Sequence, residues 1–226
     1  MLGQVLVTGG ASGLGAAVVK AVHDLGGQPL VLDKAAPAAA EVADFESVDL
    51  SDTRAAERAV RAIAERNGGL RAVVTAAGTD ACGRLDEVPA ADWERVVLVN
   101  LLGTAAVVRA ALPLLEGGRV VTIASTLGIK AVSDATAYCA SKFGVVGFTR
   151  ALAAETAGRV GVTLVIPGGM RTHFFDDREE QYRPPDDSKL NPPERVADAI
   201  VFALNQPEGC EVRELVVAHA EEGSWP

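Results

Sequence analysis

The chain has 226 residues, of which 49% are hydrophobic and 23% charged, so it can bury one sizeable core but is short for two enzyme domains. Its formal net charge is -9 and no Lys/Arg cluster offsets the acids, which argues against a nucleic-acid partner. Three scattered cysteines indicate reduced thiols. The sequence shows no basic leader segment and no run of about 18 apolar residues, so we expect a cytoplasmic location and no membrane partner.

Short, continuously apolar runs recur along the chain and predict buried parallel strands, because a strand covered on both faces shows no polar alternation. These runs lie at 4–8, 30–33, 72–75, 119–124, 162–166 and 214–218. Helical patterns lie between them, at 13–25, 52–66, 103–116 and 137–157. The alternation predicts an α/β fold: a doubly wound parallel sheet of about seven strands with helices on both faces, forming a single domain over residues 1–226.

The stretch 168–193 breaks this alternation. It contains two Pro-Pro pairs and six acidic residues, and it has no strand or helix period. A loop of this length in a compact domain is either a lid or a mobile segment. We interpret it as a substrate lid whose acids form a solvated surface, and whose negative field would disfavour strongly anionic substrates such as acyl-CoA thioesters.

The glycine-rich stretch TGGASGLG, residues 8–15, follows the first predicted strand and opens the first predicted helix. In this context Gly9 would permit a tight turn, Gly13 would let a pyrophosphate approach the backbone, and Gly15 would allow the helix to pack closely on the strand. The anion would lie at the amino end of the helix. Taken alone, the pattern is also compatible with a turn that binds no ligand.

Asp33 ends the next predicted strand. A carboxylate at this place can accept hydrogen bonds from the adenosine ribose hydroxyls and would repel a 2′-phosphate. The sequence therefore favours NAD over NADP as cofactor, although the adjacent Lys34 could compensate for part of a phosphate charge.

Tyr138 and Lys142 are four positions apart, which places both side chains on one face of a helix. A phenol with a pKa near 10 is a poor base at neutral pH unless something favours its anion. A unit charge about 4 Å away contributes about 4 kcal/mol at an effective dielectric of about 20, or about three pK units. We therefore expect Lys142 to bring the pKa of Tyr138 close to 7. Ser125 ends a predicted strand, where its hydroxyl could hold a substrate oxygen.

These residues, in this order and spacing, resemble the short-chain dehydrogenase/reductase family in its compact single-domain branch: Thr8-Gly9-(x)3-Gly13-x-Gly15, Ser125 and Tyr138-(x)3-Lys142. The resemblance covers nearly the whole chain and implies a Rossmann-like fold that forms one dinucleotide-binding and catalytic domain over residues 1–226. It implies hydride transfer with Tyr138 as general acid or base, Ser125 positioning the substrate oxygen, and Lys142 also bonded to the nicotinamide ribose. It further implies that Asn100 is a fourth catalytic residue, which interrupts a helix and helps to hold a water of the proton relay.

The resemblance also implies a set of cofactor contacts. These are Thr8, Gly9, Ser12, Gly13, Leu14, Gly15, Asp33, Asp49, Leu50, Ala77, Gly78, Tyr138, Lys142, Pro167, Gly168 and Thr172. Asp49 corresponds to the acid that contacts the adenine. One position departs from the family pattern, because Ala76 stands where an asparagine is usual, and the contacts of that side chain are lost.

The sequence thus predicts an NAD(P)-dependent oxidoreductase acting on a small secondary alcohol or carbonyl compound, with 3-oxoacyl reductase and small-alcohol or sugar dehydrogenase both open. The alternative is a non-catalytic dinucleotide-sensing protein on the same fold, and a sugar-nucleotide epimerase is disfavoured by the glycine spacing. No metal site is expected, since the histidines and cysteines lack ligand spacing. The patterns at 103–116 and 137–157 are apolar on more than one face, so each helix needs a second packing partner. The resemblance implies that these helices pair across an interface between copies of the chain, so we expect a homodimer or homotetramer.

Overall fold

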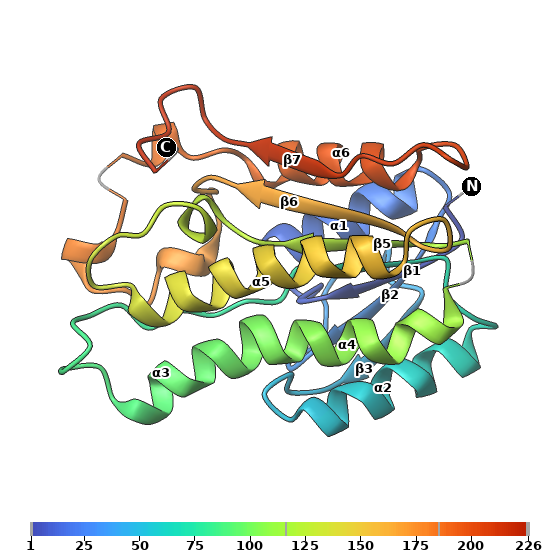
Figure 1. Ribbon diagram of the computed structural model, residues 1–226, viewed down its shortest axis with the longest axis horizontal. Helices are drawn as coiled ribbons and strands as arrows, with labels where there is room; N and C mark the ends of the chain where they lie inside the picture. The colour runs from blue at the N-terminus through green and yellow to red at the C-terminus, as the bar shows by residue number, and fades with distance from the viewer. Residues whose placement is uncertain (1, 116, 185, 225–226) are drawn as a thin grey trace.

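The computed structural model describes residues 2–115, 117–184 and 186–224 and consists of one parallel sheet between two layers of helices (Figure 1). The sheet has seven strands in the order β3-β2-β1-β4-β5-β6-β7, and every neighbouring pair is parallel. The strands are β1 Gln4–Thr8, β2 Gln28–Asp33, β3 Asp44–Ser47, β4 Ala72–Thr75, β5 Arg119–Ile123, β6 Gly161–Pro167 and β7 Glu214–Val217. The predicted doubly wound α/β fold is confirmed.

The helices cover the two faces of the sheet in separate groups. Helices α1 (Gly13–Asp24) and α6 (Pro193–Leu204) pack side by side on one face. On the other face, which is toward the viewer in Figure 1, lie α2 (Thr53–Arg66), α4 (Thr104–Ala111) and α5 (Thr136–Glu155). Helix α3 (Ala90–Val97) packs against α5 and continues through a π-helical turn, Leu98–Gly103, into α4.

Strand β1 shows why the strand sequences lack polar alternation. Val5, Leu6 and Val7 each have 0% exposed surface. Val5 and Val7 pack with the residues of α1 and α6, whereas Leu6 packs with those of α2 and α4. Full burial of such a side chain contributes about 1.5–3 kcal/mol, so both faces of the strand favour apolar residues.

Six of the seven strands match the predicted apolar runs, with bounds that differ by at most two residues. Strand β3, with sequence DFES, was not predicted, because it lies at the sheet edge and is only partly buried. Helices α3 and α6 were also not predicted. The predicted helix at 103–116 is shorter than expected as an α-helix: α4 ends at Ala111, and Pro113 lies in a following 3-10 turn.

The predicted loop at 168–193 contains no strand or α-helix before Pro193 among its described residues. It holds three short 3-10 turns, His173–Phe175, Glu180–Tyr182 and Asp187–Lys189. A single bridge between Met170 and Asn191 closes the base of the loop. The loop therefore leaves the carboxyl end of β6 and returns to the same edge of the sheet before α6 begins.

The continuous helical segment Ala90–Leu114 meets the length and composition of a membrane-crossing helix, but 56% of its most apolar window is buried inside the fold. A core helix of a soluble protein satisfies the same criteria, so this segment is weak evidence for a membrane span.

Candidate active site

A cavity of about 640 Å³ lies at the carboxyl ends of the strands. It opens where the strand order reverses between β1 and β4, which is the place where doubly wound sheets bind their ligands. Its walls come from the turn after β1, the end of β2, the loops after β3, β4, β5 and β6, helix α5 and the end of the chain. Residues far apart in the sequence therefore meet around one space.

The glycine-rich turn forms the floor of this cavity. Gly9 and Gly13 adopt φ values of 72° and 52°, which are costly for other residues. A Cβ atom on Gly15 would lie 2.0 Å from the carbonyl oxygen of Gly9, so this glycine lets α1 pack against the turn. A Cβ on Gly13 would meet only Thr172, at 3.6 Å, so its backbone faces open space.

The amino end of α1 is free to bind an anion. The N-cap residue Ser12 makes no side-chain capping hydrogen bond, and the first turn contains no acidic residue. The first backbone N–H groups of the helix therefore keep their donors and their partial positive charge directed at the cavity. A pyrophosphate fits this arrangement of open glycine backbone and uncapped helix.

Asp33 lies at the rim of the cavity, at the end of β2. Its carboxylate accepts hydrogen bonds from the backbone N–H groups of Ala11 and Ala35, each at 3.0 Å. These bonds fix the carboxylate next to the glycine-rich turn and leave each oxygen a further lone pair for a ligand hydroxyl.

Asp49 lines the cavity at the same end and is held by its neighbours. Partial burial works against its charge, but hydrogen bonds from the backbone and hydroxyl of Ser51 and from Arg95 hold the pKa of Asp49 well below its usual range. The Arg95 guanidinium lies 2.9 Å and the Lys34 ammonium 3.7 Å from the same carboxylate oxygen. Lys34 is therefore directed toward Asp49.

Ser125, Tyr138 and Lys142 all line the cavity, beside the glycine-rich turn. Ser125 follows β5, and its hydroxyl accepts a hydrogen bond from the backbone N–H of Leu127. Tyr138 and Lys142 lie on α5, with the Lys142 Nζ 5.6 Å from the centre of the tyrosine ring. The Lys142 ammonium, only 5% exposed, donates a hydrogen bond to the carbonyl of Ile123 at 2.9 Å.

The protonation of this pair differs from the expectation that Lys142 brings the pKa of Tyr138 close to 7. Burial raises the pKa of Tyr138, the negative charge of Asp80 raises it further, and a hydrogen bond to Ser125 and the Arg178 charge only partly oppose them. Burial also lowers the pKa of Lys142 to about 8. The expectation considered the charge of the lysine alone, whereas the loss of hydration of the phenolate is the larger effect here.

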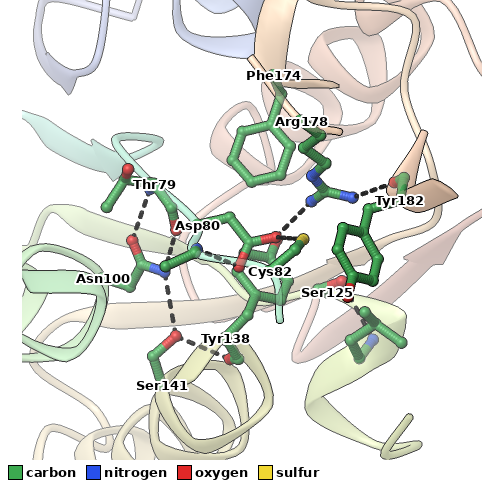
Figure 2. Close-up of polar contacts among 12 residues, drawn as sticks. Thr79, Asp80, Cys82, Asn100, Ser125, Tyr138, Ser141, Phe174, Arg178 and Tyr182 are labelled. Carbon is green, nitrogen blue, oxygen red and sulfur yellow. Dashed lines mark hydrogen bonds and ion pairs between the residues drawn. The ribbon is translucent and has the colours of Figure 1, made fainter. Parts of the chain in front are cut away.

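Asn100 is not among the residues that line the cavity. Figure 2 shows its side chain between Thr79 and Ser141. It is 1% exposed, within the π-helical turn. Its Oδ1 accepts a hydrogen bond from the Thr79 N–H at 2.8 Å, and its Nδ2 donates to the Thr79 carbonyl at 2.9 Å and to the Ser141 hydroxyl at 3.1 Å. The side chain thus joins the loop after β4 to helix α5. At Asn100 the α-helical pattern changes to a π-helical turn, within a helical segment that continues on both sides.

The loop after β6 closes the other end of the cavity. Pro167, Gly168 and Thr172 line it, and the Thr172 hydroxyl accepts a hydrogen bond from the Phe174 N–H at 3.3 Å. The carboxylate of Glu222, near the end of the chain, accepts a hydrogen bond from the Gly169 N–H at 2.8 Å.

Ser224 continues this contact between the chain terminus and the cavity wall. Its hydroxyl lies 2.5 Å from the Thr126 hydroxyl and 2.7 Å from the Glu222 carboxylate. The terminal segment is therefore part of the wall.

The structure brings together nearly all residues that the sequence analysis proposed for the site. Every proposed cofactor contact except Thr8 lines the cavity, and so do Ser125, Tyr138 and Lys142. Thr8 is buried behind the turn, where its hydroxyl accepts a hydrogen bond from the Ala77 N–H at 3.2 Å.

Some lining residues were not predicted. They are Arg95, Phe174, Phe175, Arg178, Glu222 and Ser224 among others. The aromatic and basic residues of the loop at 168–193 were a sequence signal for part of this set, whereas no local pattern marks the terminal segment.

Comparison with known proteins places the chain among dehydrogenases. A family model described as short chain dehydrogenase matches residues 4–183. A D-threitol dehydrogenase of Mycolicibacterium smegmatis is 33% identical over 218 residues, which cover 87% of this chain and 84% of that protein. An uncharacterized oxidoreductase of Staphylococcus aureus (strain MW2) is 29% identical over 224 residues, covering 94% and 95% of the two chains.

Solved structures agree in fold. Levodione reductase superposes with a TM-score of 0.87 at 24% identity, covering 100% of this chain and 99% of that chain. A short chain dehydrogenase from Burkholderia cenocepacia, solved in complex with NADP, superposes with a TM-score of 0.83 at 26% identity and covers 97% of both chains.

Proposed function

Because the chain belongs to the short-chain dehydrogenase family, we propose that it is an NAD(P)-dependent oxidoreductase that transfers a hydride between nicotinamide and a small secondary alcohol or carbonyl compound. The observation that carries this proposal is the shared cavity: Ser125, Tyr138 and Lys142 face the same space as the uncapped amino end of α1. A nucleotide held at that helix would have its reactive end within the same cavity as the three side chains.

Each residue has a distinct task in this mechanism. The nicotinamide, when bound, supplies or accepts the hydride. Tyr138 exchanges the proton of the substrate oxygen, as acid in reduction and as base in oxidation. Ser125 holds that oxygen and stabilises its developing charge. Lys142 donates to the Ile123 carbonyl with its Nζ 5.6 Å from the centre of the tyrosine ring, and in its charged form it would favour the phenolate.

The nucleotide would be held along the rest of the cavity. The glycine-rich turn and Ser12 would hold the pyrophosphate, Asp33 the adenosine ribose, Asp49 and Leu50 the adenine, and the loops at Ala77-Gly78 and Pro167–Thr172 the nicotinamide end. Asn100 and Thr8 would act from behind this surface by fixing the loop after β4.

We favour NAD over NADP for this site. The fixed carboxylate of Asp33 would repel a 2′-phosphate, and Lys34 is directed to Asp49 rather than free to compensate. In a fluorescence titration of NADH and NADPH, Asp33→Ser should weaken NADH binding and reduce the preference for NADH over NADPH by about tenfold, which equals about 1.4 kcal/mol. A preference for NADPH in the unmodified protein would exclude this assignment.

The test of the reaction is turnover of a panel of neutral alcohols and ketones with both nicotinamides. Tyr138→Phe should reduce the rate constant by about 10² to 10⁴ while NADH still binds, because the ring and its packing are kept. Binding of NADH without turnover of any compound by the wild-type protein would instead support the alternative of a dinucleotide sensor. The D-threitol dehydrogenase relative makes polyols and their ketones a sensible first part of the panel.

We also propose that the chain forms a homodimer or homotetramer in a cytoplasmic setting. Helices α4 and α5 both lie at the front of the molecule in Figure 1, and Leu102 and Phe143 in this region are 45% and 44% exposed. The three cysteines are free thiols, which suits a reducing compartment. Light scattering should give at least twice the monomer mass, and Phe143→Glu should lower it; a monomer at micromolar concentration would refute the oligomer.

A further inference from the structure

A buried ion pair joins the loop at 168–193 to the wall of the active site (Figure 2). Arg178 of this loop places its Nη2 atom 2.5 Å from the Oδ2 of Asp80, in the loop after β4. The two side chains are only 18% and 7% exposed. Arg178 also lines both the active-site cavity and a second cavity of about 610 Å³, which Asp80 lines as well.

Aromatic rings hold the guanidinium of Arg178 in place. Its central carbon lies 5.1 Å from the ring centre of Phe174 and 4.6 Å from that of Phe175. The ring of Phe174 in turn packs against the ring of Tyr138, with 5.8 Å between the centres. The ion pair and the proposed proton donor are therefore parts of one packed cluster.

Asp80 is fixed independently of the loop at 168–193. Its Oδ1 accepts a hydrogen bond from the Ala81 N–H at 2.8 Å, and its Oδ2 accepts one from the Cys82 thiol at 3.2 Å. Arg178 therefore supplies the only cationic partner of Asp80 among the ion pairs of the described residues. If the loop moves away, a negative charge remains beside Tyr138 without its counterion.

Several charged or titratable groups face Tyr138 from the elements packed against it. They are Asp80 from the loop after β4, Arg178 from the loop at 168–193, and Cys139 and Lys142 on α5, with the neutral hydroxyl of Ser125 after β5. Asp80 disfavours the phenolate, and Arg178 favours it. Arg178 and Phe174 both belong to the loop at 168–193, so the charge of Arg178 and part of the burial of Tyr138 depend on the position of this loop.

We infer that Asp80 and Arg178 are a pair of positioning residues that couples closure of the loop at 168–193 to proton exchange by Tyr138. When the loop is seated, Arg178 offsets part of the charge of Asp80 that disfavours the phenolate. When the loop is displaced, the charge of Asp80 acts on Tyr138 without this counterion. This inference rests on the proposed function for the role of Tyr138, but the electrostatic coupling itself does not require turnover.

The test measures ionisation of the tyrosine directly. The chain has only two tyrosines, so ¹³C-tyrosine labelling in a Tyr182→Phe background gives a single ring signal whose pH titration reports Tyr138. The variants are Asp80→Asn, Arg178→Met and the double variant, with Arg178→Lys as the conservative substitution. Circular dichroism checks that each variant is folded over the pH range used.

The coupling predicts an order of midpoints. Asp80→Asn should move the ring titration to lower pH, Arg178→Met should move it to higher pH, and the double variant should lie between the two single variants, because loss of a nearby negative charge favours the phenolate and loss of a nearby positive charge disfavours it. Arg178→Lys keeps the positive charge, so its midpoint should lie closer to that of the wild type than the midpoint of Arg178→Met does. Unchanged midpoints in folded variants would refute the coupling, whether or not the protein proves to be an enzyme.

Kinetics separate the coupling from substrate binding by Arg178. With a neutral ketone or alcohol that the wild-type turns over, Arg178→Met should move the pH dependence of kcat/KM in the same direction as the tyrosine midpoint. An increase in KM confined to carboxylate-bearing compounds, with no change in pH dependence, would show that Arg178 binds substrate anions and would overturn the inference.

Discussion

Replacement of Asn100 by alanine tests whether this residue acts mainly through the architecture of the site. The substitution removes three hydrogen bonds, two to the backbone of Thr79 and one to the hydroxyl of Ser141. Each such bond contributes about 1 kcal/mol, so the loss of stability should be about 3 kcal/mol. For a chain of this length 1 kcal/mol corresponds to about 2–4 °C in Tm, which predicts a decrease of about 6–12 °C.

Differential scanning fluorimetry of Asn100→Ala beside Ser141→Ala measures this effect. Ser141→Ala removes one of the three bonds and, with it, the hydrogen bond that the Ser141 hydroxyl donates to the Tyr138 carbonyl, so its Tm should fall by a smaller amount. Turnover of Asn100→Ala should also fall, because Thr79 adjoins Gly78 in the cavity wall. If Asn100→Ala keeps the wild-type Tm within about 1 °C and loses only activity, then the side chain contributes to the reaction and not to the position of the loop, contrary to our reasoning.

Two further predictions concern other parts of the cavity. Gly15→Ala should lower NADH affinity at least tenfold and lower Tm, because its Cβ would lie 2.0 Å from the Gly9 carbonyl oxygen. Gly147→Ala, with no atom of the chain within 4 Å of its Cβ, should leave NADH affinity unchanged; equal losses of affinity in calorimetric titrations would contradict this. Arg95→Ala should destabilise the protein at pH 7 but less below about pH 4. The reason is that the pKa of Asp49 is depressed in the folded state, and the stabilisation from its ion pair with Arg95 is lost as the carboxylate is protonated. Urea unfolding of variant and wild type at both pH values measures this loss of stability, and an equal loss at the two pH values would refute the prediction.

The sheet was predictable because burial on both faces leaves a clear signal. The central residues of strands such as β1 and β4 are apolar and buried, and the sequence shows this directly. Strand β3 lies at the edge, contains two acidic residues and has no fully buried position. Such a strand is determined by pairing with its neighbour β2, and that pairing leaves no pattern in its own four residues.

The candidate site was predictable where a short sequence motif determines the positions of the side chains. The glycine-rich turn, Ser125 and the Tyr138/Lys142 pair depend on local backbone and on strand ends, and they meet in one cavity. The protonation of Tyr138 was not predictable, since it depends on Asp80 and Arg178, which are 98 residues apart in the sequence. A balance between burial and distant charges requires the three-dimensional arrangement.

The contribution of the terminal segment to the cavity wall has a practical consequence for handling the protein. Glu222 and Ser224 are tied to Gly169 and Thr126, whereas β1 begins near the other end of the molecule (Figure 1). A purification tag or a surface linker fused downstream of Ser224 would therefore lie next to the opening of the cavity. The same fusion placed ahead of β1 would leave that opening clear, so the amino end is the side on which to engineer.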